Sequence, residues 1–253
     1  ADMDGGFIYA IDDAAELEAR WREIADASRD FVKTYLLYSE EYAERARDPD
    51  ARYWKGLDPN LMPRLVELAR ADGLRVSTHV ESATDFRNAV VAGVDEINHL
   101  PGFRSGGPEP QGGYGDASRI TEEDARNAAA RGTVVVTTIG SALWQGEAED
   151  NLRLLHAAGV TLAVGTDSYE ASPVREIKEL HDTDIFSDLE LLRMWAIDTP
   201  KTIFPTRRIA LLTDGYEASF LVLAGSPLQE FDFVLRIRLG VKQGHIILRE
   251  PAS

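Results

Sequence analysis

A strand–helix–strand pattern fills the stretch VSTHVESATDFRNAVVAGVDEINHL, residues 76–100. An apolar run over 74–80 predicts a strand that carries His79 at its end, and a second run over 96–100 carries His99 at the corresponding position. The segment between the two runs has the apolar period of a helix, and a glycine follows it, as is common just past a helix. The stretch therefore predicts a βαβ unit with a histidine at the same end of both strands.

The same alternation extends through most of the chain. Strands are predicted at 31–37, 74–80, 96–100, 133–139 and 161–167. Helices are predicted at 12–28, 60–71, 82–91, 121–131, 147–158, 173–180 and 187–196. Apolar strands that alternate with helices are typical of a parallel sheet covered by helices.

The pattern changes after about residue 204. The segments ASFLVLAG, FDFVLRIRLGVKQG and HIIL suggest strands joined by tight turns, without helices. We therefore predict two domains, a partial (β/α) barrel over 1–204 and a portion of a small β-sandwich over 205–253.

The amino-acid composition argues against several kinds of binding partner and site. The 253 residues have a formal net charge of −16, which argues against nucleic acid or an anionic membrane surface as a partner, because both would repel the chain. The chain has no cysteine, so disulfides and thiolate metal sites are excluded. No apolar run has the ~18 residues of a membrane-spanning helix. The chain opens ADMDGG without a signal-like segment, and its compartment, cytoplasmic or periplasmic/secreted, stays open.

Ionisable side chains lie at the ends of four of the five predicted strands. In chain order they are Lys33, His79, His99 and Asp167, and the strand at 133–139 contributes none. The carboxyl ends of parallel strands hold the active site in α/β folds. Nitrogen and oxygen donors that converge there suit zinc or a similar divalent metal.

Each of these residues alone has an ordinary structural explanation. A histidine at a strand end is more often a hydrogen-bonded structural residue, Asp167 suits a turn or a helix cap, and Lys33 could extend from a strand edge into solvent. The coincidence of four suitable residues at equivalent ends of four strands favours a functional site.

The motifs FVKTYLL, VSTHVES, GVDEINHL and LAVGTDS resemble those of the amidohydrolase superfamily of metal-dependent hydrolases, most closely its imidazolonepropionase-like and prolidase-like members. The similarity continues through LLRMWAIDTPKTIF and the C-terminal β segment. It implies a (β/α)8 TIM barrel of which this chain holds strands four to eight.

The resemblance also implies roles for the residues at the strand ends. Lys33 would be the strand-four lysine, often carbamylated so that it bridges two metals. His79 and His99 would bind the second metal, most often zinc. Asp167 would bind metal and act as the general base. One or two divalent ions are therefore expected as the cofactor.

One departure from the family pattern concerns its first strand, which carries His-x-His. No two histidines of this chain are two residues apart, and a complete barrel takes ~250 residues. We therefore expect a longer chain, or a second polypeptide, to complete the barrel and the metal site, and we leave open a homo-oligomer.

The expected reaction is hydrolysis of a C–N bond in an amide, peptide or cyclic amide by a metal-activated water. The alternatives are a non-catalytic fragment or subunit that needs a partner segment, and a lactonase or phosphoesterase on the same metal scaffold. Loops at the strand ends would contact the small-molecule or peptide substrate, and Tyr38, Arg104 and Tyr114 are the candidate residues.

Overall fold

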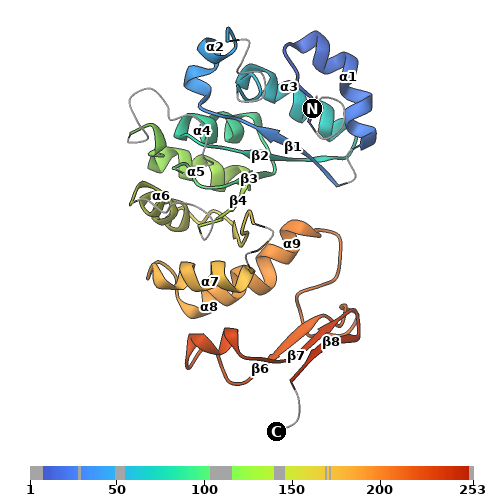
Figure 1. Ribbon diagram of the computed structural model, residues 1–253, viewed down its shortest axis with the longest axis vertical. Coiled ribbons are helices and arrows are strands. Elements are labelled where there is room, and N and C mark those ends of the chain that lie inside the picture. The colour runs from blue at the N-terminus through green and yellow to red at the C-terminus, as the bar shows by residue number, and fades with distance from the viewer. Residues whose placement is uncertain are drawn as a thin grey trace. The chain divides into compact units, whose positions relative to one another are not determined.

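The computed structural model describes residues 8–27, 30–48, 55–102, 116–139, 146–168, 170 and 172–250. These residues form two compact units (Figure 1). The first runs to Thr138 and includes the segment that ends at Thr161, and the second begins at Leu162 and includes Ile139. The domain boundary at residue 204 stays a prediction.

A parallel sheet has the strand order β1-β2-β3-β4-β5, which follows the chain, and its last strand, β5 (Leu162–Ala163), is counted with the second unit. The first unit holds the strands β1 (Phe31–Tyr35), β2 (Arg75–His79), β3 (Glu96–Asn98) and β4 (Val134–Val136). Its helices are α1 (Ala14–Ala27), α2 (Tyr42–Arg45), α3 (Met62–Ala71), α4 (Ala83–Ala92), α5 (Glu122–Arg131) and α6 (Gly146–Ala157). β1 and β2 pair in parallel, with Lys33 opposite Ser77 and Tyr35 opposite His79.

The two faces of this sheet differ in chemistry. One row across the strands, Thr34, Thr78, Ile97 and Val135, is buried. α3, α4, α5 and α6 pack side by side in chain order (Figure 1), as expected when right-handed crossovers between consecutive parallel strands place their helices on one face. This one-sided cover differs from a doubly wound sheet, which has helices on both faces.

The opposite row is polar. It starts at Lys33 and continues through Ser77 and Glu96 in register. The Ser77 hydroxyl lies 2.9 Å from Oε1 of Glu96 and 2.8 Å from Oδ1 of Asn98, whose amide donates to the same Glu96 oxygen at 3.0 Å. On β1 this face is exposed at each of its three positions.

The Asp85 carboxylate joins the ends of β1 and β2. It accepts hydrogen bonds from the backbone N–H groups of Tyr38 and Ser39, which follow β1, and of Glu81 and Ser82, which follow β2. Asp85 is fully buried and also completes a capping box with Ser82 at the start of α4. One side chain therefore sets the paths of two neighbouring loops at the carboxyl edge of the sheet.

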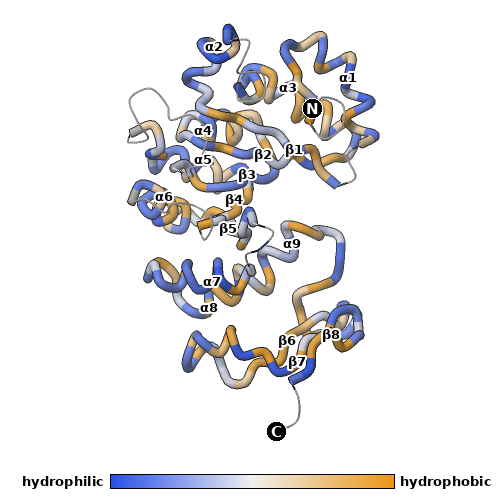
Figure 2. The backbone as a smooth tube through the Cα atoms, viewed as in Figure 1, coloured by the Kyte–Doolittle hydropathy of each residue, from blue (hydrophilic) through white to orange (hydrophobic). Residues whose placement is uncertain are grey.

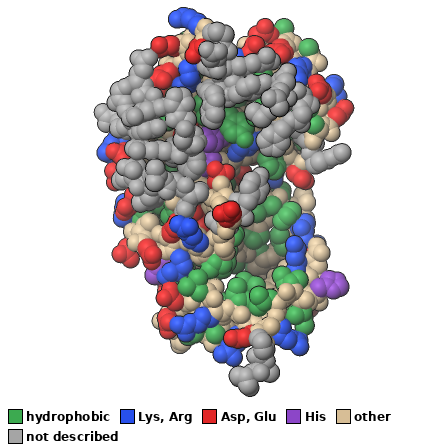
Figure 3. Space-filling model, in the orientation of Figure 1, with side chains coloured by type: hydrophobic (Ala, Val, Ile, Leu, Met, Phe, Trp, Pro, Cys, Tyr) green, Lys and Arg blue, Asp and Glu red, His purple; other side chains and the backbone are tan. Residues whose placement is uncertain are grey.

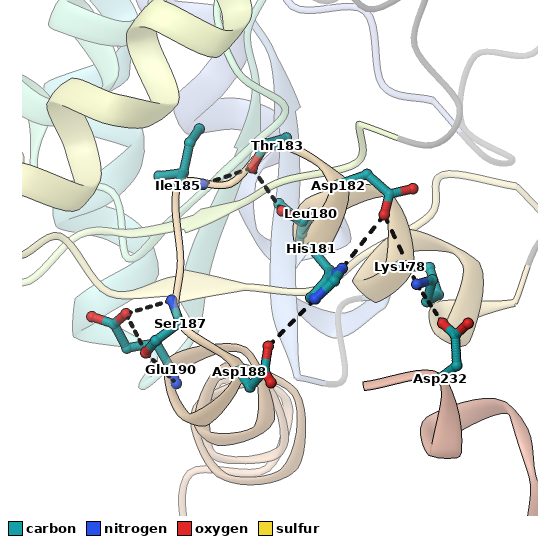
Figure 4. A network of polar contacts seen from close by, with 10 residues as sticks. All are labelled: Lys178, Leu180, His181, Asp182, Thr183, Ile185, Ser187, Asp188, Glu190 and Asp232. Atoms are coloured by element: carbon teal, nitrogen blue, oxygen red, sulfur yellow. Dashed lines mark hydrogen bonds and ion pairs between the residues drawn. The ribbon is translucent and has the colours of Figure 1, made fainter. Parts of the chain in front are cut away.

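The second unit consists of helices and an antiparallel sheet. Its helices are α7 (Pro173–Asp182), α8 (Asp188–Arg193) and α9 (Thr199–Ile203), with a π-helical turn (Met194–Asp198) between the last two. Lys178 of α7 pairs with Asp232 at 2.6 Å, and the His181 ring stacks on Phe231 with 4.3 Å between centroids. Figure 4 shows the polar contacts that connect His181 to Asp182 and Asp188, each at 3.4 Å.

The C-terminal sheet has the order β6 (Phe220–Leu223), β7 (Ile237–Lys242) and β8 (His245–Arg249). Hydrophobic residues occupy β6 and the middle of β8 (Figure 2). The expectation that the whole segment FDFVLRIRLGVKQG is a strand is wrong in its first half, because Phe231–Leu235 forms a 3₁₀ helix. Phe231 and Val234 are buried there at a spacing of three residues, which suits a 3₁₀ turn and not the alternation of a strand.

The strand predicted over 161–167 is also shorter than expected, since β5 holds only Leu162 and Ala163. The next N–H group, that of Val164, donates to the hydroxyl of Thr199 at 2.8 Å instead of to a neighbouring strand. A side-chain acceptor thus ends the ladder, and periodicity in the sequence gives no sign of it.

The described surface carries charged side chains of both signs, and Figure 3 shows them interspersed with hydrophobic ones. Within the described ranges, no helix is long and apolar enough to cross a membrane.

We predict that Asp85→Ala lowers the free energy of unfolding by about 3–5 kcal/mol, because it removes one acceptor from several buried N–H groups at once. Asp124→Ala is the matched control. Asp124 occupies the same capping-box position in α5 but also receives a bidentate pair from Arg87, and its loss should cost about 1–2 kcal/mol. Urea titration followed by circular dichroism measures both. Equal losses would contradict the role given to Asp85.

Candidate metal centre

Left-handed backbone follows four of the five parallel strands. Tyr38 (φ 48°), His99 (φ 75°), Thr138 (φ 49°) and Asp167 (φ 46°) come after β1, β3, β4 and β5. A residue other than glycine in this region costs about 1–3 kcal/mol, and such strain concentrates at functional sites. Thr138 is the clearest outlier, because a β-branched side chain disfavours positive φ.

The structure brings His79 and His99 together. His79 ends β2 and His99 directly follows β3, so the pairing of these strands places both rings at one edge of the first unit. The ring centroids are 4.5 Å apart in an edge-to-face arrangement, and both side chains are buried. Two imidazoles buried against each other form a compact pair of nitrogen donors.

Each histidine has a polar partner at one ring nitrogen. Nε2 of His79 lies 3.1 Å from Oε1 of Glu81, and Nδ1 of His99 lies 2.7 Å from Oγ1 of Thr138. Glu81 and Thr138 are themselves buried. The two partners therefore engage opposite nitrogens of the two rings.

Burial and nearby positive charge lower the pKa of His99 well below its ordinary value. The largest cause is the loss of hydration around the ring, followed by the charges of His79 and Lys33. A neutral imidazole is the form that binds a metal ion.

Lys33 lies on the polar face of β1. Its Nζ is 5.7 Å from the centroid of the Tyr35 ring, and the Tyr35 ring is 5.4 Å from that of His79. Lys33 and Tyr35 are both exposed, as expected for the outer strand of the sheet formed by the described residues.

The other predicted site residues are Asp167, Tyr38, Arg104 and Tyr114. Asp167 is exposed and belongs to the second unit, four residues after β5. Tyr38 is buried, with the Arg45 guanidinium 5.7 Å from its ring centroid. Arg104 and Tyr114 lie outside the described residues. Their roles stay predictions.

The chemistry of this pair fits a divalent metal. A metal-ligating histidine typically bonds its second ring nitrogen to a carboxylate or another polar group, as His79 does with Glu81. Oε2 of Glu81 is buried and has no hydrogen-bond partner among the described residues. Such an oxygen is uncommon in a folded protein and is consistent with a site for a ligand or an ion. Within the same residues, no group of three or more His, Asp or Glu side chains gathers to hold a metal ion.

Sequence reasoning missed Glu81, Asp85 and Thr138. Glu81 stands two residues after His79, and Thr138 follows the one strand for which no ionisable residue was found. The signal available for both was their place at a predicted strand end.

Comparison with solved structures identifies the fold. An amidohydrolase superposes with a TM-score of 0.69 at 20% identity, covering 93% of this chain and 58% of the other. A Xaa-Pro dipeptidase with bound methionine in the active site gives 0.69 at 17%, covering 92% and 58%. Phenylurea hydrolase B gives 0.67 at 17%, covering 93% and 57%. No protein-family model and no curated protein matches the chain.

These structural neighbours are hydrolases, so the resemblance predicted from the sequence motifs is confirmed at the level of the fold. The chain has the α/β fold of the amidohydrolase and prolidase group. It spans about 58% of the length of the first two of these structures.

The lowered pKa of His99 predicts how stability depends on pH in the metal-free protein. Between the unfolded pKa of about 6.5 and the lower folded value, the unfolded chain binds a proton at this site and the folded chain does not. The free energy of unfolding should therefore fall as pH drops below about 6.5, by up to ~1.4 kcal/mol per pH unit from this group.

His99→Gln should remove this part of the slope, whereas His156→Gln, in α6, should keep it. Urea titrations between pH 5 and pH 7.5 in the presence of a chelator measure the slopes. A slope that is the same in wild type and His99→Gln would contradict the shift.

Proposed function

We propose that the protein is a metal-dependent amidohydrolase that hydrolyses a C–N bond in an amide, peptide or cyclic amide. The observation that carries this proposal is the buried pair of His79 and His99 at the ends of adjacent parallel strands. The fold is shared with an amidohydrolase, a Xaa-Pro dipeptidase and a phenylurea hydrolase. This supports the proposal, because each of the three names refers to hydrolysis of a compound with C–N bonds.

We further propose that the parallel sheet is an arc of a (β/α)8 barrel. Two features support the arc: its strand order follows the chain, and its helices lie on one face. The polar face with Lys33, Ser77 and Glu96 then lines the interior, and the strands before β1 come from chain beyond these residues or from a second polypeptide. The C-terminal sheet is proposed as part of a β-sandwich.

In this proposal His79 and His99 hold a divalent ion, with zinc as the best match to two imidazoles. When bound, such an ion lowers the pKa of a coordinated water to ~7 and polarises a carbonyl group. The residues of the chain keep both histidines buried and keep the pKa of His99 low. Burial of both rings excludes competing water from their ring faces.

Asp167 is proposed as the general base and Lys33 as a further ligand, both from the sequence resemblance. Oδ of Asp167 would accept a proton from the attacking water and return it to the leaving amine. Lys33 needs carbamylation to act as a ligand, since an ammonium group has no lone pair to donate.

The proposal is tested by metal content and turnover of the complete protein. We expect hydrolysis of a panel of Xaa-Pro dipeptides, N-acyl amino acids and cyclic amides to stop on chelation and to return with zinc. His79→Ala should lower both zinc content and kcat/KM by at least ~10²-fold, and His156→Ala should change neither.

Turnover that survives complete removal of metal would contradict the proposal. Hydrolysis of lactones or phosphoesters, without any cleavage of C–N bonds, would agree with the proposed metal site but contradict the proposed reaction.

Asp167→Asn should lower kcat by ~10²–10⁴-fold with little change in the unfolding midpoint, because it removes general-base catalysis from an exposed residue. Steady-state kinetics and thermal unfolding measure the two effects. Asp184→Asn, which replaces another exposed aspartate with positive φ, is the control and should keep kcat. Near-normal kcat in Asp167→Asn would remove Asp167 from the mechanism.

A further inference from the structure

We infer that Glu81 and Thr138 are positioning residues for the two histidines. Glu81 would keep the proton of His79 on Nε2, so that Nδ1 would be the nitrogen that binds a divalent cation. Thr138 would hold the ring of His99 in one orientation through its Nδ1. This inference rests on the proposed function, which it extends from the ligands to the residues that orient them.

The geometry of Glu81 carries the first half of the argument. A carboxylate has no proton to donate, so the 3.1 Å contact from its Oε1 to Nε2 of His79 is a hydrogen bond only if that nitrogen carries the proton. A histidine with its proton on Nε2 presents the lone pair of Nδ1. The carboxylate thus selects the metal-binding nitrogen without touching the metal.

The backbone of Glu81 is fixed on both sides. Its N–H donates to Asp85 at 3.1 Å, and its carbonyl accepts from the N–H of Gly102 at 3.1 Å. These bonds tie Glu81 both to the start of α4 and to the loop after β3, which carries His99. The backbone of Glu81 is therefore fixed relative to the segments that carry both histidines.

Structural need alone does not account for a buried glutamate at this position. Helix α4 already has a complete capping box from Ser82 and Asp85, so Glu81 is not required to start it. Burial of a carboxylate is costly unless it is well paired, yet Oε2 of Glu81 has no hydrogen-bond partner among the described residues. The other carboxylate oxygen, Oε1, lies against Nε2 of His79. A role in orienting His79 explains why a carboxylate is buried here despite the free-energy cost of removing it from water.

The contact of Thr138 carries the second half of the argument. Its hydroxyl lies 2.7 Å from Nδ1 of His99, and its backbone is left-handed, which glycine or asparagine would adopt with less strain. Neither residue would place a hydroxyl against His99. The strained threonine is therefore explained if the contact to the ring is needed.

The test reads the tautomers directly in the complete, metal-free protein. Long-range ¹H–¹⁵N correlation spectra of ¹⁵N-histidine-labelled protein distinguish protonated from unprotonated ring nitrogens. We expect His79 with its proton on Nε2 at pH 7.5. Glu81→Leu should give a mixture of both tautomers at His79, and Thr138→Val should shift the ring ¹⁵N resonances of His99.

Zinc affinity provides a second readout through competition with a chromophoric chelator. Loss of such a supporting partner typically weakens metal binding by 10–100-fold, and we expect this range for Glu81→Leu. The matched control is Glu176→Leu, which removes an equally buried glutamate that accepts from the N–H of Ile139. It should leave the His79 tautomer and the zinc affinity unchanged.

Wild-type His79 with its proton on Nδ1, or Glu81→Leu with the wild-type tautomer and affinity, would overturn the inference. Should Glu81→Leu fail to fold, Glu81→Gln decides, because its amide can accept or donate and both tautomers should then be detected. A protein with the expected tautomer at His79 that binds no zinc would refute the proposed function and not the positioning. The two failures are therefore distinguishable.

Discussion

The carboxylate of Asp85 is the constraint on which the candidate site depends. It receives backbone N–H groups from the loops after β1 and β2, and those loops carry Tyr38 and Glu81. Irregular backbone at a strand end has donors that the sheet does not use, and a buried acceptor is the usual solution. Because one side chain serves two loops, a change in either loop would be transmitted to the other, and through Glu81 to His79.

The polar face of the sheet lies beside the edge at which we propose a metal centre. Neighbouring strands align Lys33 with Ser77 and Ser77 with Glu96, so the face that helices do not cover is hydrophilic from β1 to β3. A sheet packed on both faces would have no room for such a row, since buried charge must be paired to be tolerated. The hydrophobic face supplies the stability, and the other face is available for chemistry.

Strain and burial coincide at the edge where the strands end. His99 and Thr138 both have positive φ, both are buried, and they bond to each other. Such conformations persist only when the surroundings impose them. The helices α3 to α5, packed on the other face, provide that rigidity, so the cost of holding the two histidines is distributed over the core of the first unit.

The sequence by itself determined the alternation of strands and helices and the two histidines, because hydrophobic period and strand ends are local features. Strand lengths were overestimated where a distant side chain ends the ladder, as the Thr199 hydroxyl does after β5. Only the tertiary structure decided that Asp85 joins two loops and that Glu81 and Thr138 engage the histidines. These contacts connect residues that lie up to 47 positions apart in the chain, and no local pattern encodes which buried donor meets which acceptor.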